Sequence, residues 1–231
     1  MAKKNLKTAG KLKKAVTGAV LTAAVASSAF WMVKRNQPIS PLPSYEVQEV
    51  IDGDTFITTE KQHIRLRDAN APDKGNCGYQ EAKAELEQLV MGEPVYLLVK
   101  YHDQYRLYAE VYTPSGEVNE LMVKSGWARY DRSQKQNLID ARQHAQDNLL
   151  GIYGQCIATE PETTNCVIKG NINTKTSEKI YYFPGCIPYN RTVVEKDQGE
   201  AWFCSEAEAK TAGYRKALTC FGKSWPASTL R

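Results

Sequence analysis

The sequence predicts an α+β chain, mainly β, in which a five-stranded barrel with three helices precedes a small α+β domain. Two observations support this fold class. Five β-prone runs lie between residues 45 and 112, with helical patterns after the third run and after the fifth. Beyond Pro161 the sequence changes to short strand-like runs separated by turns, and this region contains four of the six cysteines. We therefore expect a barrel at 45–156 and a separate small domain at 163–223.

The first three runs predict a meander of antiparallel strands at 45–51, 55–59 and 63–67. Asp52-Gly53 predicts a tight turn between the first two strands, because glycine adopts positive φ without steric cost. Side chains alternate along a strand, so Arg65 and Arg67 should share one face of the third strand and their aliphatic neighbours the other.

The later elements of the barrel complete this pattern. They are a helix at 78–91, strands at 95–100 and 107–112, a helix at 118–125, and a helix from a Ser133 cap to Leu150 that buries Leu138, Ala141, Ala145 and Leu149. Five strands with helices after the third and near the end are compatible with an OB-type barrel.

The C-terminal region predicts a small cysteine-containing domain. Strand-like runs at 166–170, 179–183 and 202–204 precede a helix at 205–217, which Ser205 and Glu208 begin as a capping box. A domain of about 60 residues has too small a core to rely on burial alone, which favours disulfide bonds. Its aromatic residues serve either as core or as a stacking platform for bases: Tyr181, Tyr182, Tyr189 and Trp202.

The net charge of +4 is concentrated at the N-terminus. Residues 1–35 hold eight of the 30 Lys and Arg and no acid, so 22 basic and 26 acidic residues remain, a net charge of −4. The body is therefore not a broadly basic nucleic-acid binder, and any attraction for phosphate must be local.

Residues 1–36 predict an export segment. A lysine cluster precedes residues 15–33, which carry no charge and are just long enough to span a bilayer. This segment is either a cleaved signal peptide or an uncleaved anchor to the membrane of the bacterial envelope. Both alternatives put the body outside the cytoplasm, behind a proline-rich linker at 37–44, and we expect a monomer.

The cysteine count agrees with export. Six cysteines in a chain that enters an oxidising compartment predict three disulfides, with fifteen possible pairings. A zinc site is the rival interpretation, but the chain has no Cys-x-x-Cys and its three histidines lie outside the cysteine-rich region.

Most of the chemistry lies in residues 51–73. Asp54 stands where a strand leaves a turn, which lets its carboxylate hold a hard cation. Arg65 and Arg67 follow one strand later, and oxygen-bearing residues occupy the loop at 70–73. Carboxylates for a metal beside guanidinium groups for phosphate suit phosphodiester hydrolysis. A charged hairpin with an ordinary surface ion pair is the alternative from spacing alone.

These residues resemble the staphylococcal nuclease (thermonuclease) family, whose signature pairs "DGDT" with "RLRGIDAPE". The chain has DGDT at 52–55 and RLRDANAPD at 65–73. Three further motifs follow at compatible spacing: QEAK at 80–83, DQYRL at 103–107, and VNEL with GWA at 118–128. The resemblance covers roughly residues 45–155.

The resemblance implies an OB-type barrel that cleaves DNA or RNA with calcium. Carried onto matching positions, it implies calcium ligands at Asp54, Asn70 and Ala71, catalytic residues Arg65, Asp73 and Arg106, and a phosphate-pocket tyrosine at Tyr105. Asn70 replaces an aspartate of the family, Asp73 replaces a longer glutamate, and the glycine before Arg106 is missing.

These departures bear on activity. Loss of one charge near a cation should weaken calcium binding more than tenfold, unless Asp52 or Asp68 compensates. A base displaced by about 1 Å can cost on the order of 10²-fold in rate. The leading hypothesis is an exported calcium-dependent nuclease. The alternatives are a catalytically weakened barrel that binds nucleic acid or protein, and an envelope module whose C-terminal region does the binding.

Overall fold

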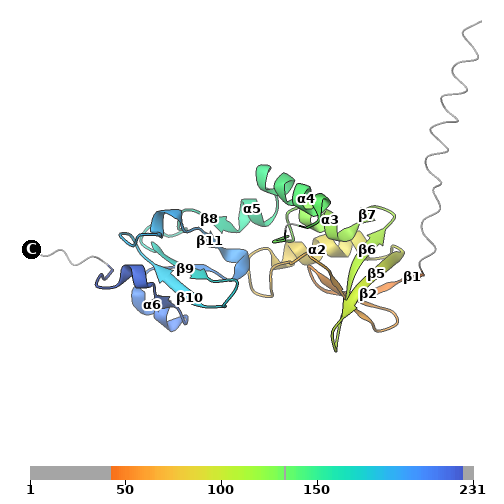
Figure 1. Cartoon of the computed structure of the whole chain (residues 1–231), viewed down its shortest axis with the longest axis horizontal. Helices are drawn as coiled ribbons and strands as arrows, with labels where there is room; N and C mark the ends of the chain where they lie inside the picture. Colours follow the sequence, from red (N-terminus) through yellow and green to blue (C-terminus); the bar gives the residue numbers. More distant parts are fainter. Residues whose placement is uncertain (1–42, 133, 226–231) are drawn as a thin grey trace, which may run out of the picture. The chain divides into compact units, whose positions relative to one another are not determined.

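The structure is a computed structural model that describes residues 43–132 and 134–225 (Figure 1). The described residues belong to one compact unit. The predicted export segment, most of the predicted linker and the predicted Ser133 cap lie outside the described residues. Within residues 43–132 and 134–225, no helix is both long enough and apolar enough to cross a membrane.

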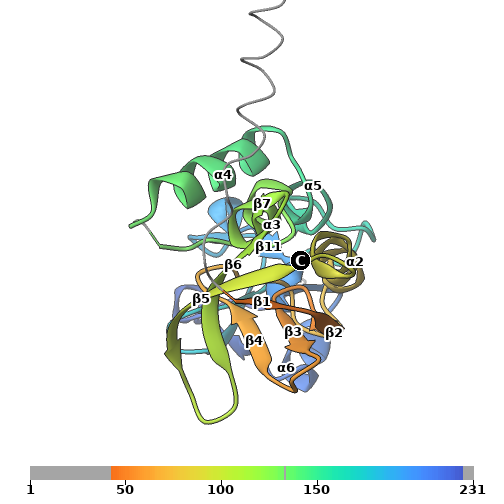
Figure 2. The ribbon, with the colours of Figure 1, turned by 90° about the vertical axis from the view of Figure 1, so that its right-hand side faces the viewer.

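The barrel is one sheet of seven strands (Figure 2). They are β1 Ser44–Tyr45, β2 Val47–Asp52, β3 Thr55–Thr58, β4 His63–Leu66, β5 Val95–His102, β6 Leu107–Thr113 and β7 Gly116–Glu117. The order is β1-β5-β6-β4-β3-β2, with β7 on β6. Strands β4 and β6 are parallel, and the other pairs of this sheet are antiparallel. Five longer strands thus form the predicted barrel, and two strands of two residues extend it.

Four helices accompany this sheet: α2 Tyr79–Val90, α3 Val118–Lys124, α4 Gln136–Asp147 and the single turn α5 Ile152–Gln155. The apolar faces of α2 and α3 pack on the strands, where Phe56, Ile64, Leu86 and Met122 are fully buried, and α4 packs on α3. Ile152 and Tyr153 of α5 belong to a separate small apolar cluster with Ala145 and Cys156. Leu138 of α4 is buried as predicted. Leu149 was predicted to be buried, but it is 68% exposed because α4 ends at Asp147 and the helical period ends with it.

The predicted turn between β2 and β3 is present at residues 53–54, but for a different physical reason. Gly53 does not adopt a positive φ. A Cβ on Gly53 would lie 2.5 Å from the Cβ of Ala82 in α2 and 2.6 Å from the Cβ of Ala71. Glycine is therefore required here because a helix and a loop both pack directly against the turn.

The C-terminal region has its own sheet and core. Its strands are β9 Ile168–Ile172, β10 Lys179–Tyr182, β12 Ala201–Phe203 and β13 Arg215–Lys216, in the order β12-β9-β10-β13. A separate pair, β8 Ile157–Ala158 and β11 Val194–Glu195, joins the end of the barrel to this region. Three short 3-10 turns complete it: η1 Tyr189–Arg191, η2 Lys196–Gln198 and η3 Leu218–Cys220.

The last helix is shorter than predicted. Ser205 caps it by accepting a hydrogen bond from the backbone N–H of Glu208, but α6 spans only Glu206–Thr211. Gly213 takes a positive φ of 84°, and the chain then runs as β13 parallel to β10. Tyr181 is fully buried in the core of this region, which removes it from any stacking platform. The domain boundaries at 156 and 163 stay a prediction.

Three disulfides use all six cysteines: Cys77–Cys156, Cys166–Cys204 and Cys186–Cys220. This confirms the predicted number and excludes the zinc alternative, since none of the cysteines is free to bind metal. The first bond ties the start of α2 to the end of α5, where a Cβ on Gly78 would lie 3.3 Å from the Cys156 sulfur. Three disulfides are typical of a protein that folds in an oxidising, extracytoplasmic compartment.

Candidate active site

Asp54 is the buried carboxylate around which the site forms. It follows Gly53 in the turn between β2 and β3, and only 2% of the residue is exposed. Its Oδ1 accepts a hydrogen bond from the Thr55 hydroxyl at 2.8 Å, and its Oδ2 accepts one from the Ala71 N–H at 3.0 Å. The Leu66 N–H donates to the Asp54 carbonyl at 2.8 Å, which fixes the turn against the end of β4.

Burial dominates the electrostatics of Asp54. Burial raises the pKa of the Asp54 carboxyl to about 7, because a charged group loses its hydration there. Arg65 lowers this pKa, and the negative charge of Asp52 raises it. Asp52 is held close, since its Oδ1 accepts the backbone N–H of Asp54 at 3.0 Å.

Arg65 joins Asp54 to the loop after β4. Its Nη1 donates to Oδ1 of Asp54, and its Nη2 donates to Oδ1 of Asn70 at 3.3 Å. The Arg65 side chain is 24% exposed, so the guanidinium group bridges a buried carboxylate and the solvent edge. Four predicted site residues are thereby brought together: Asp54, Arg65, Asn70 and Ala71.

The loop that carries Asn70 is fixed by backbone pairing. Asn70 and Arg129 form an isolated antiparallel bridge, with hydrogen bonds of 3.0 Å and 2.8 Å between their N–H and carbonyl groups. The side-chain amide of Asn119 donates to the carbonyl of Arg67 at 2.8 Å, just before the loop. These contacts hold the loop beside Asp54 although it is not part of a strand.

The donor set fits a hard divalent cation. The buried Asp54 carboxylate and the Asn70 amide oxygen lie on either side of Arg65 and are the kind of oxygen ligand that calcium prefers, whereas Ala71 presents its N–H to Asp54. No group of three His, Cys, Asp or Glu within residues 43–132 and 134–225 is arranged to hold a metal. A cation here would therefore depend on neutral oxygens as well as on carboxylates.

Asp73 lies on an exposed part of the same loop. Its backbone carbonyl accepts the N–H of Asn76 at 3.0 Å and shapes a turn. No hydrogen bond or ion pair of its carboxylate appears among the described residues. The structure thus does not join Asp73 to the cluster around Asp54.

Arg106 and Tyr105 lie on the loop between β5 and β6, which Asp103 organises. Asp103 Oδ1 accepts the N–H groups of Tyr105 and Arg106, both at 2.7 Å, and Oδ2 accepts the Tyr108 hydroxyl at 2.9 Å. These hydrogen bonds, led by that of Tyr105, lower the pKa of Asp103 to about 2. Arg106 pairs with Asp103 at 3.4 Å, and Tyr105 is 75% exposed. Neither residue contacts Asp54.

Tyr108 links the two predicted phosphate arginines, and sequence reasoning missed it. It lies opposite Arg65 in the parallel pairing of β4 with β6, and the guanidinium carbon of Arg106 lies 5.6 Å from its ring centre. Burial is the main cause that raises the pKa of Tyr108, and the charges of Arg106 and Arg65 both lower it. Parallel pairing of distant strands leaves no local sequence signal, so only the strand order could have revealed this residue.

A second tyrosine extends this surface. The rings of Tyr101 and Tyr108 stack with centroids 4.4 Å apart and planes 14° apart. Arg67 lies 6.0 Å over the Tyr101 ring, and nearly half of Tyr101 is exposed. We call the set Arg65, Arg67, Tyr101, Arg106 and Tyr108 the arginine–tyrosine face.

Comparison with known proteins identifies the family of this chain. Residues 63–155 match the family model described as "Staphylococcal nuclease homologue". The chain is 32% identical over 122 residues to an uncharacterized endonuclease of Haemophilus influenzae, which covers 50% of this chain and 68% of that protein. It is 29% identical over 133 residues to the micrococcal nuclease of Shigella flexneri, covering 50% of this chain and 76% of that protein. The chain belongs to the staphylococcal nuclease family.

Two departures from the signature of the staphylococcal nuclease family can now be located. Asn70 stands where the signature has a second aspartate, and its side-chain oxygen accepts from Arg65. Asp73 stands where the signature has glutamate, on an exposed segment that its shorter side chain does not bridge to Asp54. Both of these departures lie on the loop after β4, whereas the third, the missing glycine before Arg106, lies between β5 and β6.

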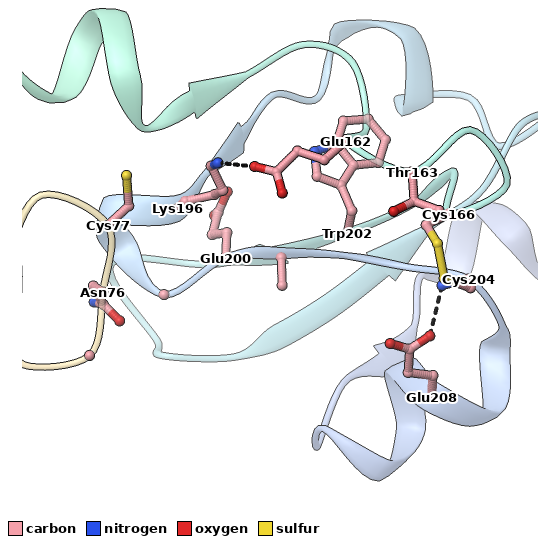
Figure 3. Close-up of a pocket in the computed structure, with 13 residues that line it drawn as sticks. Asn76, Cys77, Glu162, Thr163, Cys166, Lys196, Glu200, Trp202, Cys204 and Glu208 are labelled. Carbon is pink, nitrogen blue, oxygen red and sulfur yellow. Dashed lines mark hydrogen bonds and ion pairs between the residues drawn. A yellow bond between two sulfur atoms is a disulfide. The ribbon is translucent and has the colours of Figure 1, made fainter.

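A cavity of about 530 Å³ lies away from these residues, between residues 75–77 and the C-terminal region (Figure 3). Lys196 and Glu162 form an ion pair of 2.6 Å beside Trp202 in this cavity. None of the predicted site residues lines it. The cavity is therefore distinct from the candidate active site.

Proposed function

We propose that this chain is an extracytoplasmic nuclease that hydrolyses phosphodiester bonds of DNA or RNA with calcium. One observation carries the proposal: the Arg65 guanidinium group spans the buried Asp54 carboxylate and the Asn70 oxygen at the edge of the barrel. A positive group and hard oxygen donors are thereby presented together at a solvent edge, which is what a phosphodiester and a divalent cation require.

Asp54, Asn70 and Ala71 are the residues that would hold calcium, which when bound would neutralise charge on the phosphate and favour ionisation of water. Thr55 and the Ala71 N–H orient the Asp54 carboxylate through their hydrogen bonds. Burial keeps bulk water from this carboxylate, so its interaction with any cation is strengthened.

The arginines act on the phosphate. Arg65 would donate its N–H groups to the non-bridging oxygens, whose charge increases as water attacks phosphorus and the P–O bond to the leaving oxygen breaks. Arg106, which lies over the Tyr108 ring, would donate to the phosphate once it exchanges Asp103 for the substrate. Asp73 would accept the proton of the attacking water, and its exposed segment leaves room for a nucleic acid chain.

The arginine–tyrosine face is the surface on which the nucleic acid would lie. The net charge of −4 outside residues 1–35 excludes general attraction, so binding must be local. Arginine binds phosphate and tyrosine stacks on bases, and this face supplies both on three adjacent strands. We expect single-stranded substrate to use the exposed side of Tyr101.

The proposed location is supported by the three disulfides and by the composition of residues 1–36. Three disulfides agree with an oxidising compartment, and residues 1–36 would direct export. Attachment to the envelope membrane through residues 15–33, and a monomeric state, belong to the same proposal.

A catalytically weak barrel that only binds nucleic acid is the second candidate. It is favoured by the engagement of Arg65 with Asp54, Thr55 and Asn70, and by the lack of any hydrogen bond or ion pair of the Asp73 carboxylate among the described residues. The test is digestion of DNA and RNA by residues 42–231 in calcium and in chelator, with Arg65→Ala as the control. Cleavage that requires calcium and is lost in Arg65→Ala supports the nuclease. Binding without cleavage by the parent protein supports the second candidate.

A further inference from the structure

The loop that carries Asn70 is held from outside the barrel. Arg129, which pairs with Asn70 through the backbone, turns its side chain toward the C-terminal region. Its Nε donates to Oδ2 of Asp197 at 2.5 Å and its Nη2 to Oδ1 at 2.9 Å, which is a two-point ion pair. The Asp197 side chain is 1% exposed and the Arg129 side chain 11%, so the pair is buried.

The other end of the same loop contacts the same short turn. The Asn76 side-chain amide donates to the backbone carbonyl of Asp197 at 3.1 Å, and the Cys77 N–H donates to the carbonyl of Lys196 at 3.4 Å. Gly199 follows η2 with a positive φ, and a Cβ there would lie 3.4 Å from the Asn76 oxygen. Figure 3 shows Asn76 and Cys77 beside the backbone that bears Lys196.

Residues 70–77 are therefore fixed at both ends by η2 of the C-terminal region. At the first end the contact passes through Arg129, and at the second it is direct. The Cys77–Cys156 disulfide adds a covalent link at the second end. Between these ends lies Asp73, whose carboxylate makes no hydrogen bond or ion pair among the described residues.

We propose that η2 of the C-terminal region positions the active-site loop, with Asp197 acting through Arg129 on Asn70 and Ala71. Asp197 and Arg129 are positioning residues: neither touches the substrate. The expected effect on calcium affinity rests on the proposed function, whereas the expected effect on the order of residues 70–77 does not. The C-terminal region is thus part of the catalytic unit and not an appended binding module.

The alternative role for Asp197 is general stability of the C-terminal region. Glu206 provides a matched control, because it forms an ion pair of 2.9 Å with Lys216 inside that region and does not contact residues 70–77. Asp197→Asn and Glu206→Gln both remove one negative charge from a C-terminal ion pair. Only Asp197→Asn should change the mobility of residues 70–77. Asn76→Ala removes one hydrogen bond at the other end and serves if Asp197→Asn does not fold.

The first measurement is amide hydrogen exchange of the full chain without calcium or substrate. Loss of the charge-assisted hydrogen bonds in Asp197→Asn should speed exchange in residues 70–77 about tenfold. Asn76→Ala should speed it less, and Glu206→Gln should leave it unchanged. Unchanged exchange at 70–77 in both Asp197→Asn and Asn76→Ala overturns the proposal, as does equal acceleration in Glu206→Gln. Because this readout needs no cleavage, it stands even if the chain is not a nuclease.

The second measurement is the calcium dependence of cleavage. In metal sites, loss of a residue that orients the ligands costs about 10- to 100-fold in metal affinity or activity. Asp197→Asn should raise the calcium concentration for half-maximal rate by about tenfold, and saturating calcium should restore most of the rate. A lower rate at all calcium concentrations with an unchanged half-maximal point would contradict the positioning role.

Discussion

Replacement of Arg65 by alanine is the most direct test of the site. Arg65 touches Asp54 and Asn70 through different nitrogens of one guanidinium group. Alanine removes both contacts and any donor to the phosphate. Lysine at this position keeps the charge but has one nitrogen, so it cannot reach both oxygens as the planar group does. We expect activity to fall in the order parent, Arg65→Lys, Arg65→Ala.

The contacts of Arg65 allow the expected losses of turnover and of unfolding free energy to be estimated. Loss of one preorganised donor to a developing negative charge costs about 10²–10³ in turnover, or about 3–4 kcal/mol of activation free energy. The free energy of unfolding should change less. A buried carboxylate that loses its cation typically costs about 3–5 kcal/mol, but Asp54 can take up a proton instead. Its pKa is already raised to about 7, so we expect a loss of only about 1–2 kcal/mol in unfolding.

Arg67→Ala is the matched control, because Arg67 follows on the same face and contacts Asp68 at 3.3 Å instead of Asp54. The assay is single-turnover cleavage of a labelled oligonucleotide at saturating calcium, with urea unfolding of each variant. Arg67→Ala should raise KM and leave turnover nearly unchanged. Turnover of Arg65→Ala within about threefold of the parent, or an equal loss in Arg67→Ala, would refute the role of Arg65.

Three further predictions concern the same site. Asn70→Asp adds a negative charge beside Asp54 and should lower the half-saturating calcium concentration more than tenfold. Asp73→Glu should mainly raise turnover. A calcium titration of both single variants and the double variant measures both effects and tests their expected non-additivity. Tyr101→Ala should raise KM for single strands about tenfold without lowering turnover, since each base stack contributes about 1–3 kcal/mol, and an unchanged KM would remove Tyr101 from the substrate surface. The folded-state pKa of Asp103 lies near 2, below its ordinary value, so the loop order it supports is present above about pH 4 and is lost as pH falls through 2. Amide NMR signals of this loop should stay constant from pH 5 to 8, and a transition inside that range would contradict the assignment.

Local patterns in the sequence predicted the barrel well because its strands and helices are short and strongly periodic. The alternation at residues 63–67 correctly predicted that Ile64 is buried and that Arg65 is partly exposed. The same method failed at Leu149, where the helix had already ended, and in the C-terminal helix, where Gly213 stops the helical backbone early. Periodicity assigns a face only while the backbone keeps its period.

Local sequence patterns could not predict contacts between segments that are distant in the chain. The motifs predicted the cluster of Asp54, Arg65 and Asn70 because the three residues belong to one signature. The stacking of Tyr101 on Tyr108 depends on how β5 and β6 pair, and the Arg129–Asp197 ion pair joins residues 68 positions apart. A charged residue in a sequence does not reveal its partner, so these contacts required coordinates.

The Cys77–Cys156 disulfide has a consequence for the order in which the chain oxidises. Its cysteines are 79 residues apart, and Cys166 follows shortly after Cys156 as a competing partner. During synthesis Cys77 emerges long before either, so chain proximity cannot select the correct thiol. In the folded chain α5 lies beside the start of α2, and the absence of a side chain at Gly78 leaves room for the Cys156 sulfur, since a Cβ there would lie 3.3 Å from it. The docking of α5 beside α2 thus brings together two thiols that chain proximity alone would not pair.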